Sequence, residues 1–253
     1  MSPTFTSSID LAQVALYGFW VFFAGLIWWL RREDRREGYP LEGDNPRKVL
    51  PVSSMFIPAP KTFAKPEGGE SSAPSFARDE REVNATRLAL AGGSPLQPNG
   101  DPLLSGVGPA SWAARHDEPE LTREGHDLIQ PMRKATTFTL LAGPDPRGWP
   151  VLGADGKSAG TVKDLWVDAA DVTVRYLELS LENGSTRLVP VPSLKLQSEQ
   201  RHVSVDALLS TQFEHVPVLK SPDRVTVLEE EKISAFYAGG RLYAEARRLG
   251  PVV

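Results

Sequence analysis

A run of twenty residues without a charged side chain, from Leu11 to Leu30, constrains the fold of this chain more than any other feature. Twenty helical residues rise about 30 Å, which matches the hydrocarbon core of a bilayer. Ten of the twenty are Leu, Ile, Val or Phe, and each such residue favours insertion by about 0.3–0.6 kcal/mol. The run therefore predicts a membrane-spanning helix, which we assign to residues 11–31.

The charges on the two sides of this run predict its orientation. Residues 1–10 contain no Lys or Arg, whereas a cleaved signal peptide, the alternative interpretation, carries positive charge before its apolar segment. The run is followed by RREDRREGYP, and the positive-inside rule places that end in the cytoplasm and residues 1–10 on the periplasmic side. Side chains expected at the membrane surface and its lipids are Trp28, Trp29, Arg31, Arg32, Arg35 and Arg36.

Residues 32–109 are rich in proline and glycine, which interrupt helices and strands. A solvated linker is one interpretation of this composition. Apolar side chains nevertheless recur in the segment, among them Met55, Phe56 and Ile57, and a solvated linker does not need them. We therefore expect an extended cytoplasmic strap that lies against a partner surface.

Residues 110–253 are expected to form a β-rich cytoplasmic domain. Leu177, Leu179 and Leu181 alternate with polar residues, which is typical of a half-buried strand, and Asn183–Gly184 is a hairpin-turn signal. Several such short runs predict a small antiparallel barrel or sandwich. Further strands are expected at 160–168, 185–191, 202–208 and 224–230. Apolar residues at helical spacing from Ile233 predict a terminal helix that Gly239–Gly240 ends.

The composition excludes several classes of protein. The chain has no cysteine, which excludes disulfide scaffolds, thiolate metal sites and cysteine nucleophiles. Its net charge of −4 argues against nucleic acid as a partner. Phosphate-binding loops, dinucleotide fingerprints and hydrolase motifs are absent from the sequence. We therefore expect a protein that is not an enzyme.

Two clusters of titratable residues are candidates for proton exchange. One contains Glu124 and His126, and it is also a candidate for a weak surface site for a divalent ion. The other contains Asp168 and Asp171 after a predicted strand, with Arg175 and Asp164 nearby in the sequence. Clustered carboxylates repel each other, which raises some of their pKa values and eases proton exchange. Ordinary solvated turn chemistry is the alternative for both clusters.

Short strings in a fixed order connect the whole chain to a known family. It resembles the H subunits of the photosynthetic reaction centre of purple bacteria. The matching strings are REGYPL, PKTF, GDP, GVGPASW, PM, LWVD, GSTRL, KSP, LEEEK and YAGG. This resemblance implies a single N-terminal transmembrane helix followed by a domain of the PRC-barrel type.

The resemblance also implies a function. The chain would be a non-catalytic subunit that caps the L and M subunits, tunes electron transfer between the primary and secondary quinones, and conducts protons to the secondary quinone. L and M would carry bacteriochlorophyll, bacteriopheophytin, quinones, non-haem iron and a carotenoid, with none of these held mainly by this chain. A cytochrome subunit, a light-harvesting antenna and membrane lipids are further implied partners.

Only some of the residues that form the proton-entry region in this family have a match in this sequence. His126 matches one of two histidines, whereas Glu124 occupies the position of the other and Thr122 that of an acid. Asp168 matches the first acid after the LWVD strand, and Asp171 replaces a glutamate. A membrane-tethered adaptor for another protein and a membrane hydrolase using Asp168 and Asp171 are the competing functions.

Overall fold

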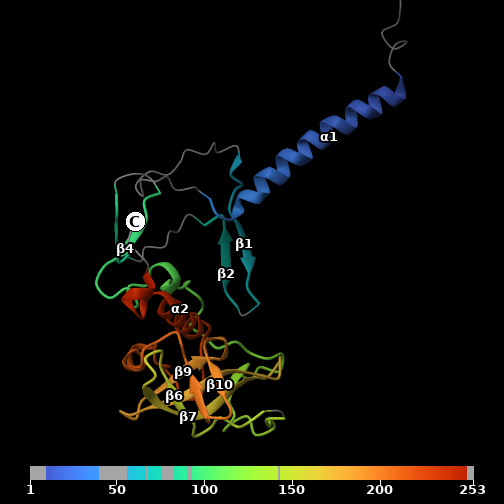
Figure 1. Cartoon of the computed structure of the whole chain (residues 1–253). Helices are drawn as coiled ribbons and strands as arrows, with labels where there is room; N and C mark the ends of the chain where they lie inside the picture. The colour runs from blue at the N-terminus through green and yellow to red at the C-terminus, as the bar shows by residue number, and fades with distance from the viewer. Residues whose placement is uncertain are drawn as a thin grey trace, which may run out of the picture. The chain divides into compact units, whose positions relative to one another are not determined.

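The computed structural model describes most of the chain, in two compact units (Figure 1). The described residues are 10–39, 56–66, 68–75, 82–89, 93–141 and 143–249. We call residues 1–81 with 90–94 the anchor unit, and residues 82–89 with 95–253 the sheet unit. Residues 1–9 of the expected periplasmic segment 1–10 lie outside the described residues, as do parts of the expected strap, at 40–55, 67, 76–81 and 90–92.

The anchor unit begins with the apolar helix. Helix α1 runs from Leu11 to Glu33, and Asp10 caps it by accepting a hydrogen bond from the backbone N–H of Ala12 at 3.3 Å. The short helix η2, Asp34–Arg36, continues it to a total of 26 residues, long and apolar enough to cross a membrane. None of the α1 side chains is buried within the chain. This confirms the N-terminal apolar helix, and its exposed side chains suit a lipid or protein environment outside the chain.

A β-hairpin is attached to the end of this helix. Strands β1, Lys61–Ala64, and β2, Glu70–Ala73, pair antiparallel. Arg36 Nη1 donates to the carbonyl oxygens of Ala59 and Ala73, each at 2.9 Å, and Lys61 Nζ lies 3.1 Å from Glu33 Oε2. The segment that follows the helix is therefore bound to it by specific contacts.

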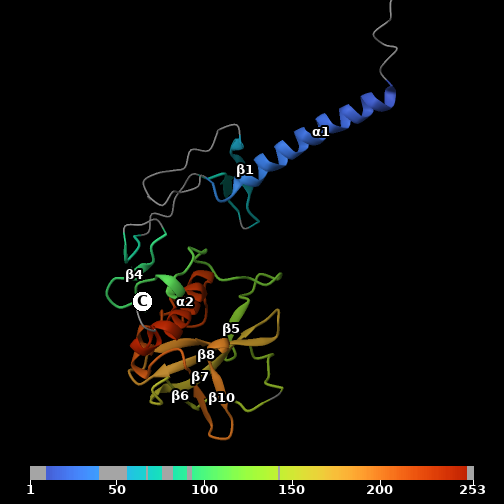
Figure 2. The same ribbon diagram turned by 45° about the horizontal axis from the view of Figure 1, so that its top comes forward.

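A mixed, mostly antiparallel sheet of seven strands forms the centre of the sheet unit (Figure 2). The order is β10-β11-β6-β7-β8-β9, with β5 also paired to β7, and only the β11–β6 pair is parallel. These strands are β5 Ile129–Pro131, β6 Pro150–Leu152, β7 Ser158–Asp168, β8 Thr173–Leu181, β9 Thr186–Pro190, β10 Lys195–Gln197 and β11 His202–Ser204. Strands β3, Ala85–Arg87, and β4, Leu96–Pro98, form a separate two-stranded antiparallel sheet.

The longest strands explain why this sheet forms a core. Leu177, Leu179 and Leu181 of β8 are buried, as their alternation predicts. Glu178 between them is also buried, with 3% of its surface exposed, so both faces of β8 are covered. The expectation of a solvated second face is therefore wrong at this position, because polar groups from other segments cover it.

Helix α2, Val227–Tyr243, packs against the sheet in both views (Figures 1 and 2). The strand expected at 224–230 is wrong, because α2 begins within this segment. At its start, the Thr226 hydroxyl accepts a hydrogen bond from the Glu229 backbone N–H at 3.1 Å. In return, Glu229 Oε2 accepts a hydrogen bond from the Thr226 backbone N–H at 2.8 Å. This reciprocal capping begins a helix. The remaining short helices are η4 Gly108–Ala110, η5 Val191–Ser193, η6 Ser210–His215 and η7 Ala246–Leu249.

The glycine pair expected to end this helix lies inside it. A β-carbon at Gly239 would lie 2.6 Å from Ala110 Cβ, and one at Gly240 would lie 2.4 Å from the carbonyl oxygen of Ala207. Both glycines are buried, so they are required for close packing and not for chain reversal. The helix brings Ile233, Phe236 and Tyr237 into a core with Trp166 and Phe213 of the sheet unit.

Candidate functional site

Asp168, the last residue of β7, has a buried side chain with 4% of its surface exposed. Its Oδ1 accepts hydrogen bonds from the backbone N–H groups of Ala170 at 2.9 Å and Asp171 at 3.1 Å. These bonds hold the turn into β8, where Val172 has a left-handed φ of +53°. Asp168 thus supports the turn, while the Asp171 side chain is exposed.

Polar contacts continue from this turn to α2. Arg175 Nε lies 3.8 Å from Asp168 Oδ2. The next residue of β8, Tyr176, is buried, and its hydroxyl donates to Glu230 Oε2 at 2.7 Å. Glu230 is half-buried in the first turn of α2. The structure therefore adds a second, half-buried carboxyl to the site, one that was not among the candidates predicted from the sequence.

The surroundings of Glu230 favour its protonated form. Burial raises the pKa of this carboxyl above its ordinary value, and the negative charges of Glu120 and Asp168 act in the same direction. The hydrogen bond from Tyr176 and the charge of Arg175 oppose this rise without cancelling it. A carboxyl whose pKa is raised exchanges protons closer to neutral pH, which is the property that a proton relay needs.

We expect this raised pKa to appear in the pH dependence of stability. A group whose pKa is higher in the folded state stabilises the fold below its unfolded pKa, and this stabilisation is lost as pH rises through the folded pKa. The Glu230→Gln variant lacks this loss. Urea unfolding of the full chain in detergent from pH 4 to 8 is expected to show the wild type losing stability relative to the variant as pH rises. Parallel curves for the two proteins would contradict the raised pKa.

The other predicted cluster lies in the loop before β5. Thr122 and His126 close this loop, because the Thr122 backbone N–H donates to the His126 carbonyl oxygen at 2.7 Å. The side chains of Glu124 and His126 are exposed, and neither makes a hydrogen bond or ion pair to any residue that the structure describes. Asp127 Oδ2, by contrast, is 2.9 Å from Arg224 Nε. An open hollow of about 470 Å³ is lined by Thr122, Glu124, Gly125, His126, Asp127, Gln130, Ala169 and Arg224.

The sheet brings the two clusters to one edge. Ile129 of β5 pairs with Asp168 of β7, and the Ala169 backbone N–H donates to the Leu128 carbonyl oxygen at 2.8 Å. Ala169, which follows Asp168, lines the same hollow as His126. An exposed histidine and an enclosed acid therefore lie on neighbouring segments, which the sequence separation of about forty residues does not reveal.

Metal binding receives no further support at this edge. Among the described residues, no group of three or more His, Asp or Glu side chains is placed to hold a metal ion. Glu124 and His126 supply two ligands, whereas most protein metal sites use more. The surface ion at these two residues stays a prediction.

The residues expected at the membrane surface have different roles in the anchor unit. Arg36 is engaged within the chain, because Nε lies 2.7 Å from Glu33 Oε2 in addition to its two carbonyl contacts. Arg32 lies over the Trp28 ring at 5.5 Å and Arg35 over the Phe56 ring at 5.1 Å. Arg31 and Trp29 are exposed. Arg31, Arg32 and Arg35 make no ion pair to an acid among the residues that the structure describes.

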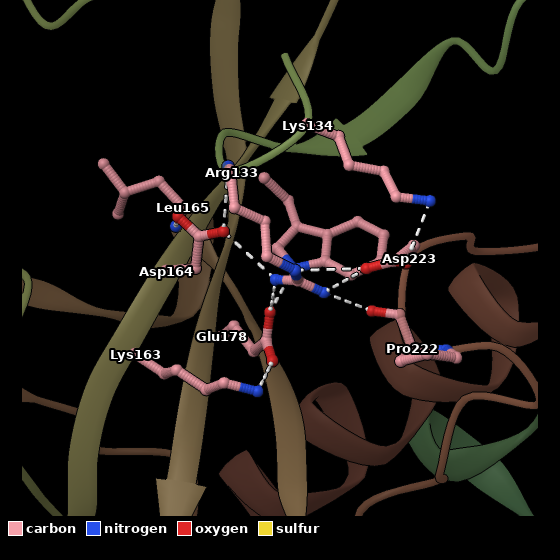
Figure 3. A network of polar contacts seen from close by, with 9 residues as sticks. Arg133, Lys134, Lys163, Asp164, Leu165, Glu178, Pro222 and Asp223 are labelled. Atoms are coloured by element: carbon pink, nitrogen blue, oxygen red, sulfur yellow. Dashed lines mark hydrogen bonds and ion pairs between the residues drawn. The ribbon is translucent and has the colours of Figure 1, made fainter. Parts of the chain in front are cut away.

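A further polar network, which the sequence did not indicate, centres on Arg133 (Figure 3). Its guanidinium donates to Asp164 Oδ2 at 3.0 Å, to Glu178 Oε2, and to Asp223 Oδ1 at 2.7 Å. Asp164 and Glu178 are buried and pair across β7 and β8. Asp164, expected near Asp168, is thus held in a separate cluster.

Other groups complete this Arg133 network. Glu178 also accepts hydrogen bonds from Lys163 Nζ at 2.8 Å and Trp166 Nε1 at 3.1 Å. Arg133 Nη2 donates to the Pro222 carbonyl oxygen, and Lys134 Nζ lies 2.9 Å from Asp223 Oδ2 (Figure 3). Three cations and three carboxylates therefore balance in charge, and their contacts hold the segments around Arg133 and Asp223 against β7 and β8.

Comparison with known families identifies two adjoining segments. The family model of the photosynthetic reaction centre, H-chain N-terminal region, matches residues 3–134, slightly more than half of the chain. The model of the PRC-barrel domain matches residues 138–211. Arg133 lies at the end of the first match, and its buried partners Asp164 and Glu178 lie in the second. The Arg133 network therefore joins the two segments.

Proposed function

The chain belongs to the H-chain family of the photosynthetic reaction centre, and from this premise we propose that it caps the L and M subunits on the cytoplasmic side. Membership implies a reaction centre complex with other subunits, and the apolar helix fits a membrane-anchored protein. In this proposal the chain is not an enzyme. It shields the quinone region, tunes electron transfer from the primary to the secondary quinone, and conducts protons to the secondary quinone.

The edge shared by the two clusters is the observation that carries the proton-conducting role. His126 and Glu124 are exposed at a hollow that Ala169 also lines, and Asp168, the residue before Ala169, is buried. Glu230 is half-buried, and the negative charge of Asp168 acts on it. An ordinary histidine has a pKa of about 6.5, so it exchanges protons with water near neutrality. Burial raises the pKa of Glu230 above its ordinary value, so this carboxyl exchanges protons closer to neutral pH. Protons would enter at the hollow and pass inward over Asp168, Asp171 and Glu230, with Arg175 moderating the negative charge.

The pigments and redox groups belong to the partners in this proposal. Bacteriochlorophyll, bacteriopheophytin, quinones, non-haem iron and a carotenoid are expected on L and M. The contribution of this chain is to exclude water and to move protons. A cytochrome subunit and a light-harvesting antenna are further proposed neighbours.

The proposed orientation places residues 1–10 in the periplasm and the sheet unit in the cytoplasm. The basic residues after the apolar helix support it through the positive-inside rule. Arg31, Arg32 and Arg35 would contact anionic lipid headgroups, with Trp28 and Trp29 at the interface. Arg36 would instead brace the hairpin, because its guanidinium is engaged with Glu33, Ala59 and Ala73.

Flash-induced electron transfer in the purified membrane complex tests the proton-conducting role. Two variants, Glu230→Gln and the double variant His126→Ala with Asp171→Asn, are expected to slow the second, proton-coupled electron transfer by at least about tenfold, because each removes groups that exchange protons. Primary charge separation is expected to persist.

The matched control is Glu182→Gln, which removes an exposed carboxyl just beyond the opposite end of β8. It is expected to leave proton uptake unchanged. Wild-type rates of proton uptake in both test variants would exclude these groups as the relay. Absence of bacteriochlorophyll absorption from the complex purified with this chain would contradict the assignment to L and M and favour an adaptor function.

A further inference from the structure

Tyr176 makes the single hydrogen bond that the Glu230 carboxyl accepts within the part of the chain that the structure describes. The Tyr176 side chain belongs to β8 and is buried, whereas Glu230 lies in the first turn of α2 and is half-buried. The Tyr176 hydroxyl donates to Glu230 Oε2 at 2.7 Å, across the contact between the strand and the helix. This distance is that of a well-formed hydrogen bond between two oxygens, so it fixes one of the two carboxyl oxygens.

The other carboxyl oxygen of Glu230 is uncommitted. Oε1 accepts no hydrogen bond and makes no ion pair within the described ranges. It is not one of the enclosed polar atoms that lack a partner, so it reaches solvent. Ser234, one turn further along the same face of α2, lines a cleft of about 340 Å³ together with Arg175 and Tyr176. Solvent therefore reaches this side of the helix, beside the half-buried carboxyl.

The two oxygens of Glu230 therefore differ in what they can do with a proton. A protonated carboxyl has one O–H group that donates and one carbonyl oxygen that only accepts. Because Tyr176 donates to Oε2, the proton of a neutral Glu230 belongs on Oε1, where water can deliver or remove it. Burial and the negative charge of Glu230 raise the pKa of the Tyr176 hydroxyl, so Tyr176 keeps its own proton and stays a donor.

We propose that Tyr176 is a positioning residue for Glu230: its hydroxyl holds Oε2, so that the carboxyl takes up and releases its proton at Oε1. A proton that arrives from water forms a bond to Oε1 as its bond to the water oxygen breaks, and the reverse step returns it. Tyr176 itself neither gains nor loses a proton in this exchange. The importance of this arrangement for electron transfer rests on the proposed proton relay.

The Tyr176→Phe variant isolates this contact, because it keeps the ring and removes only the donor. The charged groups that act on Glu230, namely Glu120 before β5, Asp168 of β7 and Arg175 of β8, are all retained. A donor to a carboxylate favours its charged form, so its removal is expected to raise the pKa of Glu230 further. The carbonyl group of the protonated carboxyl also loses its hydrogen bond.

Infrared difference spectroscopy of the purified membrane complex at a series of pH values tests both effects. The carbonyl band of protonated Glu230 is assigned by its absence from Glu230→Gln. In Tyr176→Phe, we expect the band to move to higher frequency and its titration midpoint to rise by about one pH unit, the size expected for one hydrogen bond to a charged group. The matched control is Tyr243→Phe at the other end of α2, where the hydroxyl donates to the Val107 carbonyl oxygen at 3.4 Å. It is expected to leave both values unchanged.

Three results would overturn the role of Tyr176. One is an unchanged frequency and midpoint in a Tyr176→Phe complex that keeps the circular dichroism of the wild type. Another is an equal change in Tyr243→Phe, because the effect would then not depend on the contact with Glu230. The third needs no variant of Tyr176: a wild-type band at the frequency of a carbonyl without a hydrogen bond.

The second electron transfer, measured on the same complexes, tests the relay separately. The pH at which its rate falls is expected to move upward in Tyr176→Phe, in step with the infrared midpoint. A wild-type rate in Glu230→Gln would instead exclude Glu230 from the relay. The infrared result alone decides whether Tyr176 positions the carboxyl, so the two failures are distinguishable.

Discussion

Replacing Arg133 by alanine is expected to lower the free energy of unfolding by about 3 kcal/mol, which is the low end of the range for breaking a buried ion pair. The buried carboxylates of Asp164 and Glu178 would lose the cation that they share. The loss stays at the low end because Lys163 still binds the other oxygen of Glu178. Urea unfolding of the full chain in detergent, followed by far-ultraviolet circular dichroism, measures this change.

The matched control is Arg147→Ala. Arg147 pairs with Asp145 at 2.6 Å, but both side chains are 44% exposed. An exposed pair contributes about 0–1 kcal/mol, so this variant is expected to unfold almost as the wild type does. An equal loss in both variants would show that burial of the carboxylates is irrelevant.

A double-mutant cycle separates charge from packing in the Arg133 network. Glu178→Gln removes a buried negative charge while its amide oxygen still accepts from Trp166 Nε1. In this background, Arg133→Ala is expected to cost clearly less than in the wild type, because less uncompensated charge is left buried. Strict additivity of the two changes would contradict a direct charge interaction.

Gly240→Ala is expected to destabilise the sheet unit, although alanine favours helices over glycine by about 1 kcal/mol. The new β-carbon would lie 2.4 Å from the Ala207 carbonyl oxygen and 2.5 Å from Leu208 Cδ2. The oxygen belongs to the backbone and cannot move aside as a flexible side chain does. Overpacking of a core typically costs about 1–3 kcal/mol, so the expected net effect is a loss of about that size.

The control for this substitution lies two residues away in the same helix. Ala238 is exposed, so Ala238→Gly is expected to cost only the difference in helix propensity, about 1 kcal/mol. Thermal unfolding of both variants distinguishes the two causes. If Gly240→Ala stabilised the protein, the close approach of residue 240 to Ala207 would not be a source of destabilisation.

Local sequence patterns predicted the secondary elements where one physical property dominates. The helix predicted for the uncharged run from Leu11 is confirmed as α1, because the length and apolar character of this run leave few alternatives to a helix. The alternation at Leu177, Leu179 and Leu181 became β8. The prediction of a strand at 224–230 was wrong, because Thr226 and Glu229 cap each other by reciprocal hydrogen bonds and α2 begins there.

The candidate site was predictable only in its local parts. His126, Asp168 and Asp171 drew attention because their residue types exchange protons or repel each other when clustered. Glu230 gave no such signal, because its enclosure depends on the contact between α2 and Tyr176 of β8. Arg133 was missed for the same reason: the carboxylates that it contacts lie about thirty to ninety residues away in the sequence.

By itself, the sequence determined the apolar helix, the β-rich domain with its terminal helix and the family, since these depend on hydropathy, periodicity and short strings within a few residues. The tertiary structure decided which charges are buried, which glycines are in close contact, and that His126 and Asp168 lie at one edge. Those properties arise from long-range packing, which removes particular groups from water and places distant segments in contact. Burial and proximity, and not residue type alone, set the pKa of Glu230 and the charge balance around Arg133.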